Sequence, residues 1–177
     1  MQQDLLLIRK MQNGDEEAME NFVQKYYPKI LQYCRYHCPD RESAQDLTQE
    51  TFEHFFKSLV KYRNNGKALN YLYTIAKNLC IDWTRKSGRQ VIESSGEEAD
   101  RIENIAGETD MADRITERVI IESALAKLPD ELREVVILHY FQDCSMREIA
   151  AILQIGIPLV KYRMKKAKGI LQDILEK

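Results

Sequence analysis

The chain has 177 residues, a formal net charge of −2 and a hydrophobic share of 44%. That share is ordinary for globular proteins, so the chain can build one or two small cores. No apolar run approaches the roughly 18 residues needed to span a bilayer, and the start, MQQDLLLIRKMQNGDEE, lacks the basic region of a signal peptide. We therefore expect a soluble cytoplasmic protein with no membrane insertion of its own.

The first part of the chain is patterned for helices. Apolar residues recur at helical spacing at Met19, Phe22, Val23 and Tyr26, and Pro28 then indicates a break or a new helix start. The next segment has an apolar stripe formed by Leu47, Phe52, Phe55, Phe56, Leu59 and Val60. YRNNGK, residues 62 to 67, predicts a turn-rich loop. An amphipathic helix follows, with apolar positions at Leu72, Ile75, Ala76, Leu79, Cys80 and Trp83.

The pattern fails from Ser87, where Ser, Gly and Glu replace most apolar residues. Helices resume near Met111, first with a shared apolar face at Ile121, Ala124, Leu125 and Leu128. Leu132, Val135 and Val136 begin another helix after Pro129. We find no convincing strand, no glycine-rich phosphate loop and no sign of a cofactor. The sequence predicts an all-α fold, with small helical domains at 1–88 and 114–177 joined by a flexible acidic linker at 89–113.

The segment CSMREIAAILQIGIPLVKYRMKKAKGIL predicts a helix-turn-helix. Ser145 and Glu148 form a capping box, and Pro158 fits the first turn of a second helix. That helix has an apolar face at Val160, Met164, Ala167 and Leu171. Such motifs usually carry glycine in the turn, four residues after a small alanine. Here Gln154 holds that position, so we expect a differently shaped turn, because a non-glycine residue resists positive φ.

Charge is segregated along the chain. Residues 57 to 89 carry eight basic residues and one acidic residue, whereas residues 90 to 117 carry nine acidic and two basic residues. A second basic stretch, VKYRMKKAK, lies in the helix-turn-helix. Two basic stretches separated by an acidic one indicate anionic partners at two places, with solvated helix faces as the alternative.

Several segments together resemble a known family. DLTQETF, HFFKSLVKY and YLYTIAKNLCIDWTRK resemble the first conserved domain of RNA polymerase sigma factors. The compact length and LPDELREVVILHYFQDCSMREIAAIL are similar to the extracytoplasmic-function (ECF) subgroup. The resemblance covers the chain except for the linker, and it implies a promoter-specificity subunit that binds core polymerase and helps to open the −10 element.

The resemblance also implies roles for particular residues. A polymerase-docking face on the β′ clamp helices would comprise Asp46, Gln49, Glu50 and Glu53, which could otherwise be a solvated acidic face. The −10 element would be bound by Lys61, Tyr62, Arg63, Asn64, Lys67, Tyr71, Lys77, Asn78, Arg85 and Lys86. These residue types suit capture of unstacked bases, which needs aromatic surfaces, amides and cations. The −35 element would be bound by Pro158, Lys161, Tyr162, Arg163, Lys165 and Lys166, in a domain that leans on the β-subunit flap.

Other interpretations stay open at this stage. The acidic linker could mimic nucleic acid in polymerase channels or could merely keep a tether soluble. A stand-alone regulator with a helical N-terminal domain is the alternative function. We expect no enzyme, since His37, His54 and His139 lack a paired nucleophile or metal spacing. Cys34 and Cys38, beside His37, suit buried positions better than a metal site. Members of the subgroup are commonly held inactive by an anti-sigma factor, which would be a further partner.

Overall fold

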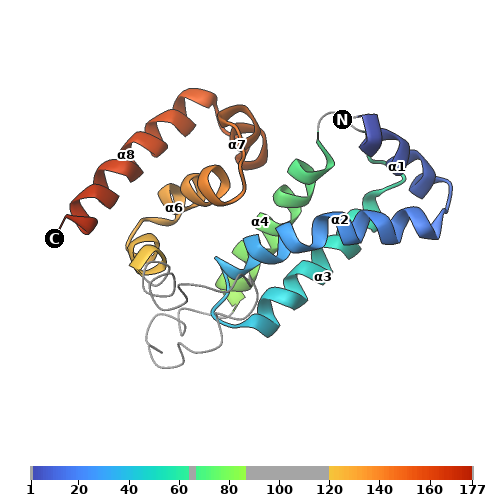
Figure 1. The fold of residues 1–177 in the computed structure, drawn as a ribbon, viewed down its shortest axis with the longest axis horizontal. Helices are drawn as coiled ribbons and strands as arrows, with labels where there is room; N and C mark the ends of the chain where they lie inside the picture. The colour runs from blue at the N-terminus through green and yellow to red at the C-terminus, as the bar shows by residue number, and fades with distance from the viewer. Residues whose placement is uncertain (1, 64–66, 87–119, 177) are drawn as a thin grey trace, which may run out of the picture. The chain divides into compact units, whose positions relative to one another are not determined.

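The computed structural model describes residues 2–63, 67–86 and 120–176, and every regular element in these ranges is helical. The chain divides into two compact units, Met1–Glu98 and Ala99–Lys177 (Figure 1). The all-α fold with two helical domains is therefore confirmed. The predicted linker at 89–113 and the predicted domain limits at 88 and 114 lie outside the described residues.

The N-terminal unit contains four helices, α1 (Gln2–Gln12), α2 (Glu16–Arg35), α3 (Arg41–Ser58) and α4 (Ala68–Lys86) (Figure 1). Asp15 begins α2 by accepting a hydrogen bond from the Ala18 backbone N–H, at 3.0 Å. Asp40 begins α3 in the same way, by accepting from Ser43 N–H at 2.7 Å. Each carboxylate satisfies a backbone donor that the first helical turn leaves without an intrahelical partner.

The core of this unit is largely aromatic. Phe22 of α2 stacks on Phe55 of α3 with ring centroids 4.7 Å apart, and both rings are fully buried. Tyr33 and Tyr73 connect α2 to α4, with centroids 5.4 Å apart. Aromatic pairs at these separations add to the stabilisation from area burial alone. The three longer helices therefore enclose one core.

Two predictions about this unit were wrong. Pro28 does not interrupt the helix but lies inside α2. Tyr26 and Ile30 on either side of it are both buried, so packing along the whole helix outweighs the roughly 3 kcal/mol that an internal proline costs. Val60 was placed on the apolar stripe, yet it is 88% exposed. Because α3 ends at Ser58, the helical spacing no longer applies at Val60.

The C-terminal unit begins, within the described residues, with a helical segment at 120–126. It continues through α6 (Asp130–Val136), a π-helical turn η2 (Ile137–Phe141), α7 (Met146–Leu153) and α8 (Ile157–Leu175) (Figure 1). Its core includes Ala124, Leu125, Leu128, Val135, Ile149, Ile152, Val160, Met164 and Ala167. Ile121, expected on this apolar face, is 43% exposed instead. None of the described helices is long and apolar enough to cross a membrane.

Candidate nucleic-acid and polymerase interfaces

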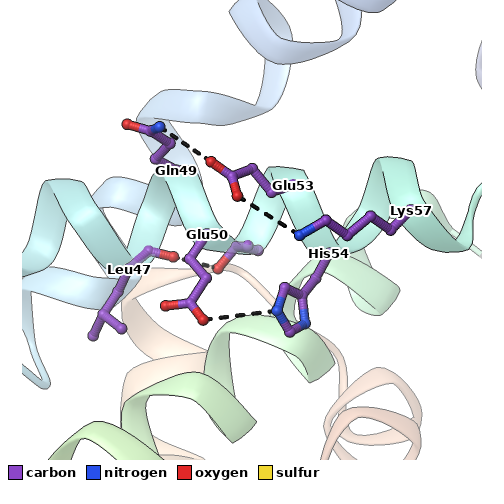
Figure 2. Close-up of polar contacts among 7 residues, drawn as sticks. Leu47, Gln49, Glu50, Glu53, His54 and Lys57 are labelled. Carbon is purple, nitrogen blue, oxygen red and sulfur yellow. Dashed lines mark hydrogen bonds and ion pairs between the residues drawn. The ribbon is translucent and has the colours of Figure 1, made fainter.

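The polar side of α3 carries the four residues predicted for polymerase docking, and all four are exposed: Asp46, Gln49, Glu50 and Glu53. Figure 2 shows that contacts one helical turn apart connect three of them to each other or to basic neighbours. Gln49 Nε2 donates to Glu53 Oε1 at 3.1 Å. Glu53 Oε2 lies 3.9 Å from Lys57 Nζ, and Glu50 Oε1 lies 3.7 Å from His54 Nε2.

The opposite side of α3 faces the core. Leu47, Phe52 and Phe55 are buried there, together with two threonines. Each threonine hydroxyl donates to a carbonyl of its own helix at 2.7 Å, Thr48 to Ala44 and Thr51 to Leu47. The acidic face has no such structural task, because exposed ion pairs of this kind contribute little to stability. It is therefore available to a partner.

The turn that follows α3 is held by the end of α1. The Gln12 side-chain amide donates to the backbone carbonyls of Leu59, at 3.0 Å, and Tyr62, at 3.2 Å. Lys61 and Arg63 are exposed beside these anchored positions, and Lys67 is exposed where the described chain resumes. Asn64 lies outside the described residues. Three predicted phosphate-binding cations thus lie on the surface around one loop.

The two tyrosines predicted for the −10 element contact each other. Tyr62 and Tyr71 are half-buried with centroids 5.1 Å apart, and both rings approach the buried Phe55. Tyr71 also lies within hydrogen-bond distance of Ser58, with its hydroxyl oxygen 3.3 Å from Ser58 Oγ. Burial, and next the neighbouring Tyr71, raise the pKa of Tyr62 above its ordinary value. The pair is therefore anchored on the aromatic core through Phe55.

The outer face of α4 combines an amide, an aliphatic residue and charges. Asn78, Ile81, Asp82 and Arg85 are exposed and lie on one face by helical spacing, and Arg85 Nη1 lies 3.8 Å from Asp82 Oδ1. Lys86 is exposed at the end of the helix, whereas Lys77 is half-buried. Sequence reasoning missed Ile81, which is 42% exposed. The signal was present, because Ile81 falls outside the apolar stripe of this helix.

The predicted helix-turn-helix corresponds to α7 and α8. Ser145 N–H donates to Glu148 Oε2 at 2.8 Å and Glu148 N–H donates to Ser145 Oγ at 3.3 Å, which confirms the capping box. The expectation of a differently shaped turn was wrong. Gln154 adopts the left-handed conformation, with φ 56° and ψ 43°, that glycine usually provides. The next N–H, of Ile155, donates back to the Ala150 carbonyl at 3.0 Å and closes the turn.

The six α8 residues predicted for DNA binding do not share one environment. Pro158, Lys161, Tyr162, Lys165 and Lys166 are exposed, whereas Val160 and Met164 are buried on the opposite side. Arg163 is different, because only 17% of its side chain is exposed and Nη2 donates to Glu131 Oε2 at 2.6 Å. The guanidinium therefore ties α8 to α6. Sequence reasoning also missed two exposed aliphatic residues at the start of α8. Leu159 lies off the inward spacing and is 40% exposed, whereas Ile157 continues that spacing but is still 37% exposed in the first turn.

The cysteines are all free and buried. A hydrogen bond to Cys34, a second to Cys38 and burial raise the pKa of the Cys80 thiol well above its ordinary value. Buried thiols of this kind are unreactive. Over the described ranges, no three His, Cys, Asp or Glu side chains are placed to hold a metal ion.

Comparison with protein families identifies both units. The family model for sigma-70 region 2 matches residues 22–90, and the model for sigma-70 region 4 matches residues 118–171. The first match includes the acidic face of α3, the loop and α4. The second includes α6, α7 and most of α8. Together the two models match most of the chain.

Curated relatives match over nearly the full length. The ECF RNA polymerase sigma factor SigW of Bacillus subtilis is 29% identical, over 95% of this chain and 94% of its own. The RNA polymerase sigma-H factor of Pseudomonas aeruginosa is 28% identical, over 99% of this chain and 95% of its own.

Solved structures show the same fold. CnrH, in complex with the cytosolic domain of CnrY, is similar with a TM-score of 0.74 at 22% identity, over 97% of this chain and 96% of that chain. The sigma factor RpoE of Bartonella quintana, in complex with the anti-sigma factor NepR, gives 0.66 at 25% identity, over 89% and 96%.

Proposed function

The chain belongs to the sigma-70 family as an ECF RNA polymerase sigma factor, and on that premise we propose how its surfaces direct promoter-specific transcription. The N-terminal domain, 1–88, docks on polymerase and opens the −10 element. The C-terminal domain, 114–177, binds the −35 element. The segment 89–113 connects the two. The polymerase supplies the chemistry of RNA synthesis, in the cytoplasm, and this chain supplies the choice of promoter.

The residues that dock on the β′ clamp helices are Asp46, Gln49, Glu50 and Glu53. These side chains are exposed together on α3, and their contacts with each other and with Lys57 and His54 are of the exposed kind that a partner cation displaces at little cost. The buried side of the same helix is packed into the aromatic core, so the face is presented on a rigid support.

The loop and α4 bind and open the −10 element. Lys61, Arg63 and Lys67 are exposed and suit phosphates, and Asn78 is exposed with an amide that suits a base edge. Arg85, Lys86 and the half-buried Lys77 extend the basic surface along α4. Tyr62 and Tyr71 contact each other and are only half-buried, so an aromatic surface is available there for stacking by an unstacked base. Asn64 completes the predicted set.

Helix α8 binds the −35 element. The second helix of a helix-turn-helix enters the major groove, and Pro158, Lys161, Tyr162, Lys165 and Lys166 are all exposed on this one. Arg163 contributes by fixing α8 against α6 rather than through an open guanidinium. The DNA-binding role rests on the remaining five side chains.

The proposal that this chain selects promoters rests on one observation. Each of the two helical units presents its own exposed basic surface, on the loop and α4 in one and on α8 in the other, although the chain is slightly acidic overall. A single DNA-binding regulator needs only one such surface. Two surfaces in one chain match the two elements of a bacterial promoter.

The test is transcription by purified bacterial core polymerase on fragmented DNA from the source organism, with and without this protein. We expect discrete new start sites that share two upstream elements. The absence of new transcripts, combined with tight duplex binding by the protein alone, would indicate a stand-alone regulator instead.

Two further partners follow from the family. We propose that the C-terminal domain contacts the β-subunit flap of polymerase. We also propose that an anti-sigma factor holds this chain inactive, because the similar RpoE structure contains one. Co-purification of the chain with core polymerase and with an inhibitory protein from the source organism tests both.

A further inference from the structure

The first turns of α8 present apolar side chains to the outside. Ile157 is 37% exposed, Leu159 40% and Tyr162 60%, and Pro158 is exposed beside them. We call these four residues the apolar tip. Burial of Val160, Met164 and Ala167 fixes which side of α8 faces the core, so Pro158, Leu159 and Tyr162 point outward, and Ile157 is exposed at the edge of the buried side, where the helix begins. These residues are consecutive or one turn apart, and a contiguous exposed apolar patch, unlike a single exposed residue, indicates contact with a partner.

The charges around the apolar tip indicate which partner this is. Lys161, Lys165 and Lys166 are all exposed on the same outward half of α8. The helix contains no acidic residue before Asp173. An occupant of this surface must therefore offer apolar groups at its centre and negative charge at its margins. The major groove of duplex DNA has this arrangement, with phosphates on both sides of the base edges.

The chemistry of the apolar tip then limits what it can recognise. Ile157, Pro158 and Leu159 have no side-chain donor or acceptor, so they cannot bond to the polar edges of bases. The one apolar group that a base pair presents in the major groove is the C5-methyl of thymine. The residues at the start of a recognition helix are those that reach the base edges.

We propose that the apolar tip recognises thymine methyl groups in the −35 element, so that this chain selects A·T pairs there by hydrophobic contact. This inference rests on the proposed function of α8. The lysines around the tip hold the phosphates and fix the position of the helix without selecting a sequence. Burial of one methyl group changes affinity about fourfold, equivalent to about 0.8 kcal/mol.

The experiment removes the methyl groups and nothing else. Holoenzyme, made from core polymerase and the full chain, is bound to a promoter found in the transcription test, with thymine in the −35 element replaced by deoxyuridine. A matched template carries deoxyuridine only in the spacer. We expect affinity to fall about fourfold for each contacted methyl in the −35 element, and to stay unchanged for the spacer template.

Two protein variants show which side chains produce the difference between thymine and deoxyuridine templates. Leu159→Ala should reduce or abolish the difference between thymine and deoxyuridine templates, because the contact is already lost. Lys165→Ala should weaken both templates equally and reduce the salt dependence by about one phosphate contact. Both side chains are exposed, so neither substitution disturbs the core.

The outcomes separate this inference from the proposed function. Equal binding to thymine and deoxyuridine templates overturns the inference, while the function stands if scrambling the −35 element abolishes transcription. A scrambled −35 element without effect overturns both. Weakened polymerase binding by Leu159→Ala in the absence of DNA also overturns the inference, because the tip would then be a protein contact.

Discussion

Replacing Gln154 by glycine should stabilise the helix-turn-helix. The structure holds Gln154 at φ 56° between α7 and α8, where a side chain costs about 1–2 kcal/mol relative to the right-handed region. Glycine removes that cost but loses about 0.4–1 kcal/mol more backbone entropy on folding. The difference leaves Gln154→Gly more stable by about 0.5–1 kcal/mol.

Amide hydrogen exchange on the full chain measures this gain in stability within the C-terminal unit. The amides of α7 and α8 should exchange about two- to fivefold more slowly in Gln154→Gly, because their opening free energy rises by that amount. Trp83, the only tryptophan, lies in α4 and so does not report on this unit. The exchange rates of α2 and α3 in the other unit should stay the same.

A neighbouring glycine provides the matched control. Gly156 caps α8 with φ −69° and ψ 147°, which any residue adopts, and an added Cβ would lie 3.6 Å from Pro158 Cδ, an ordinary contact. Gly156→Ser should therefore keep or slightly raise the protection of the α8 amides from exchange, since serine is a favourable residue at the N-cap position. If Gln154→Gly exchanges as fast as the natural chain, or if Gly156→Ser is the more damaging change, the argument from positive φ is wrong.

Three other changes test the remaining surfaces. Glu50→Lys should weaken core polymerase binding about tenfold or more without changing the unfolding midpoint, because its contact with His54 is exposed. Asn78→Ala should slow promoter opening about tenfold, as expected for loss of a base contact of 1–3 kcal/mol, with polymerase binding intact. Asp4→Asn should cost at most about 1 kcal/mol of stability at neutral pH. Although burial acts the other way, hydrogen bonds from Lys25 and Tyr26 lower the pKa of Asp4, so in the natural chain this stability should be present above about pH 4 and lost as the pH falls further. Polymerase capture measures the effect of Glu50→Lys, and retained binding would contradict the prediction. Permanganate footprinting measures promoter opening by Asn78→Ala, and unimpaired opening would contradict it. Urea unfolding followed by Trp83 measures the stability of Asp4→Asn, and a loss that does not depend on pH would contradict it.

Periodicity predicted the helices because burial repeats along them. Phe55, Leu72, Val160 and Met164 are buried as their spacing requires. The failures fall where a helix ends or where packing overrides a local preference. Val60 lies two residues after the last residue of α3, and its exposure depends on a helix end that spacing alone does not locate. Pro28 stays inside α2 because contacts distant in sequence hold both halves of the helix together, and a local signal contains no information about them.

The candidate sites were predicted as regions better than as individual contacts. The acidic face of α3 follows directly from helical spacing around a buried stripe, and its four members are exposed together. Tyr62 and Tyr71 were chosen for residue type, and whether a half-buried aromatic ring faces a base or its neighbour depends on tertiary packing. Ile157 and Leu159 were overlooked for the opposite reason, since aliphatic residues are expected inside and attract attention only once the structure exposes them.

Arg163 shows why a run of basic residues is not a uniform surface. In VKYRMKKAK the cations at Lys161, Lys165 and Lys166 fall on the outward half of α8. Arg163 instead lies three residues after the buried Val160 and four before the buried Ala167, and so borders the buried side. A lysine there would bring one strongly hydrated point charge to Glu131, whereas the planar guanidinium is less strongly hydrated and suits a site where the cation itself is largely buried. Arg163→Lys should therefore loosen α8 from α6 and lower promoter affinity on thymine and deoxyuridine templates alike. A selective loss on thymine templates would place Arg163 among the residues that contact bases.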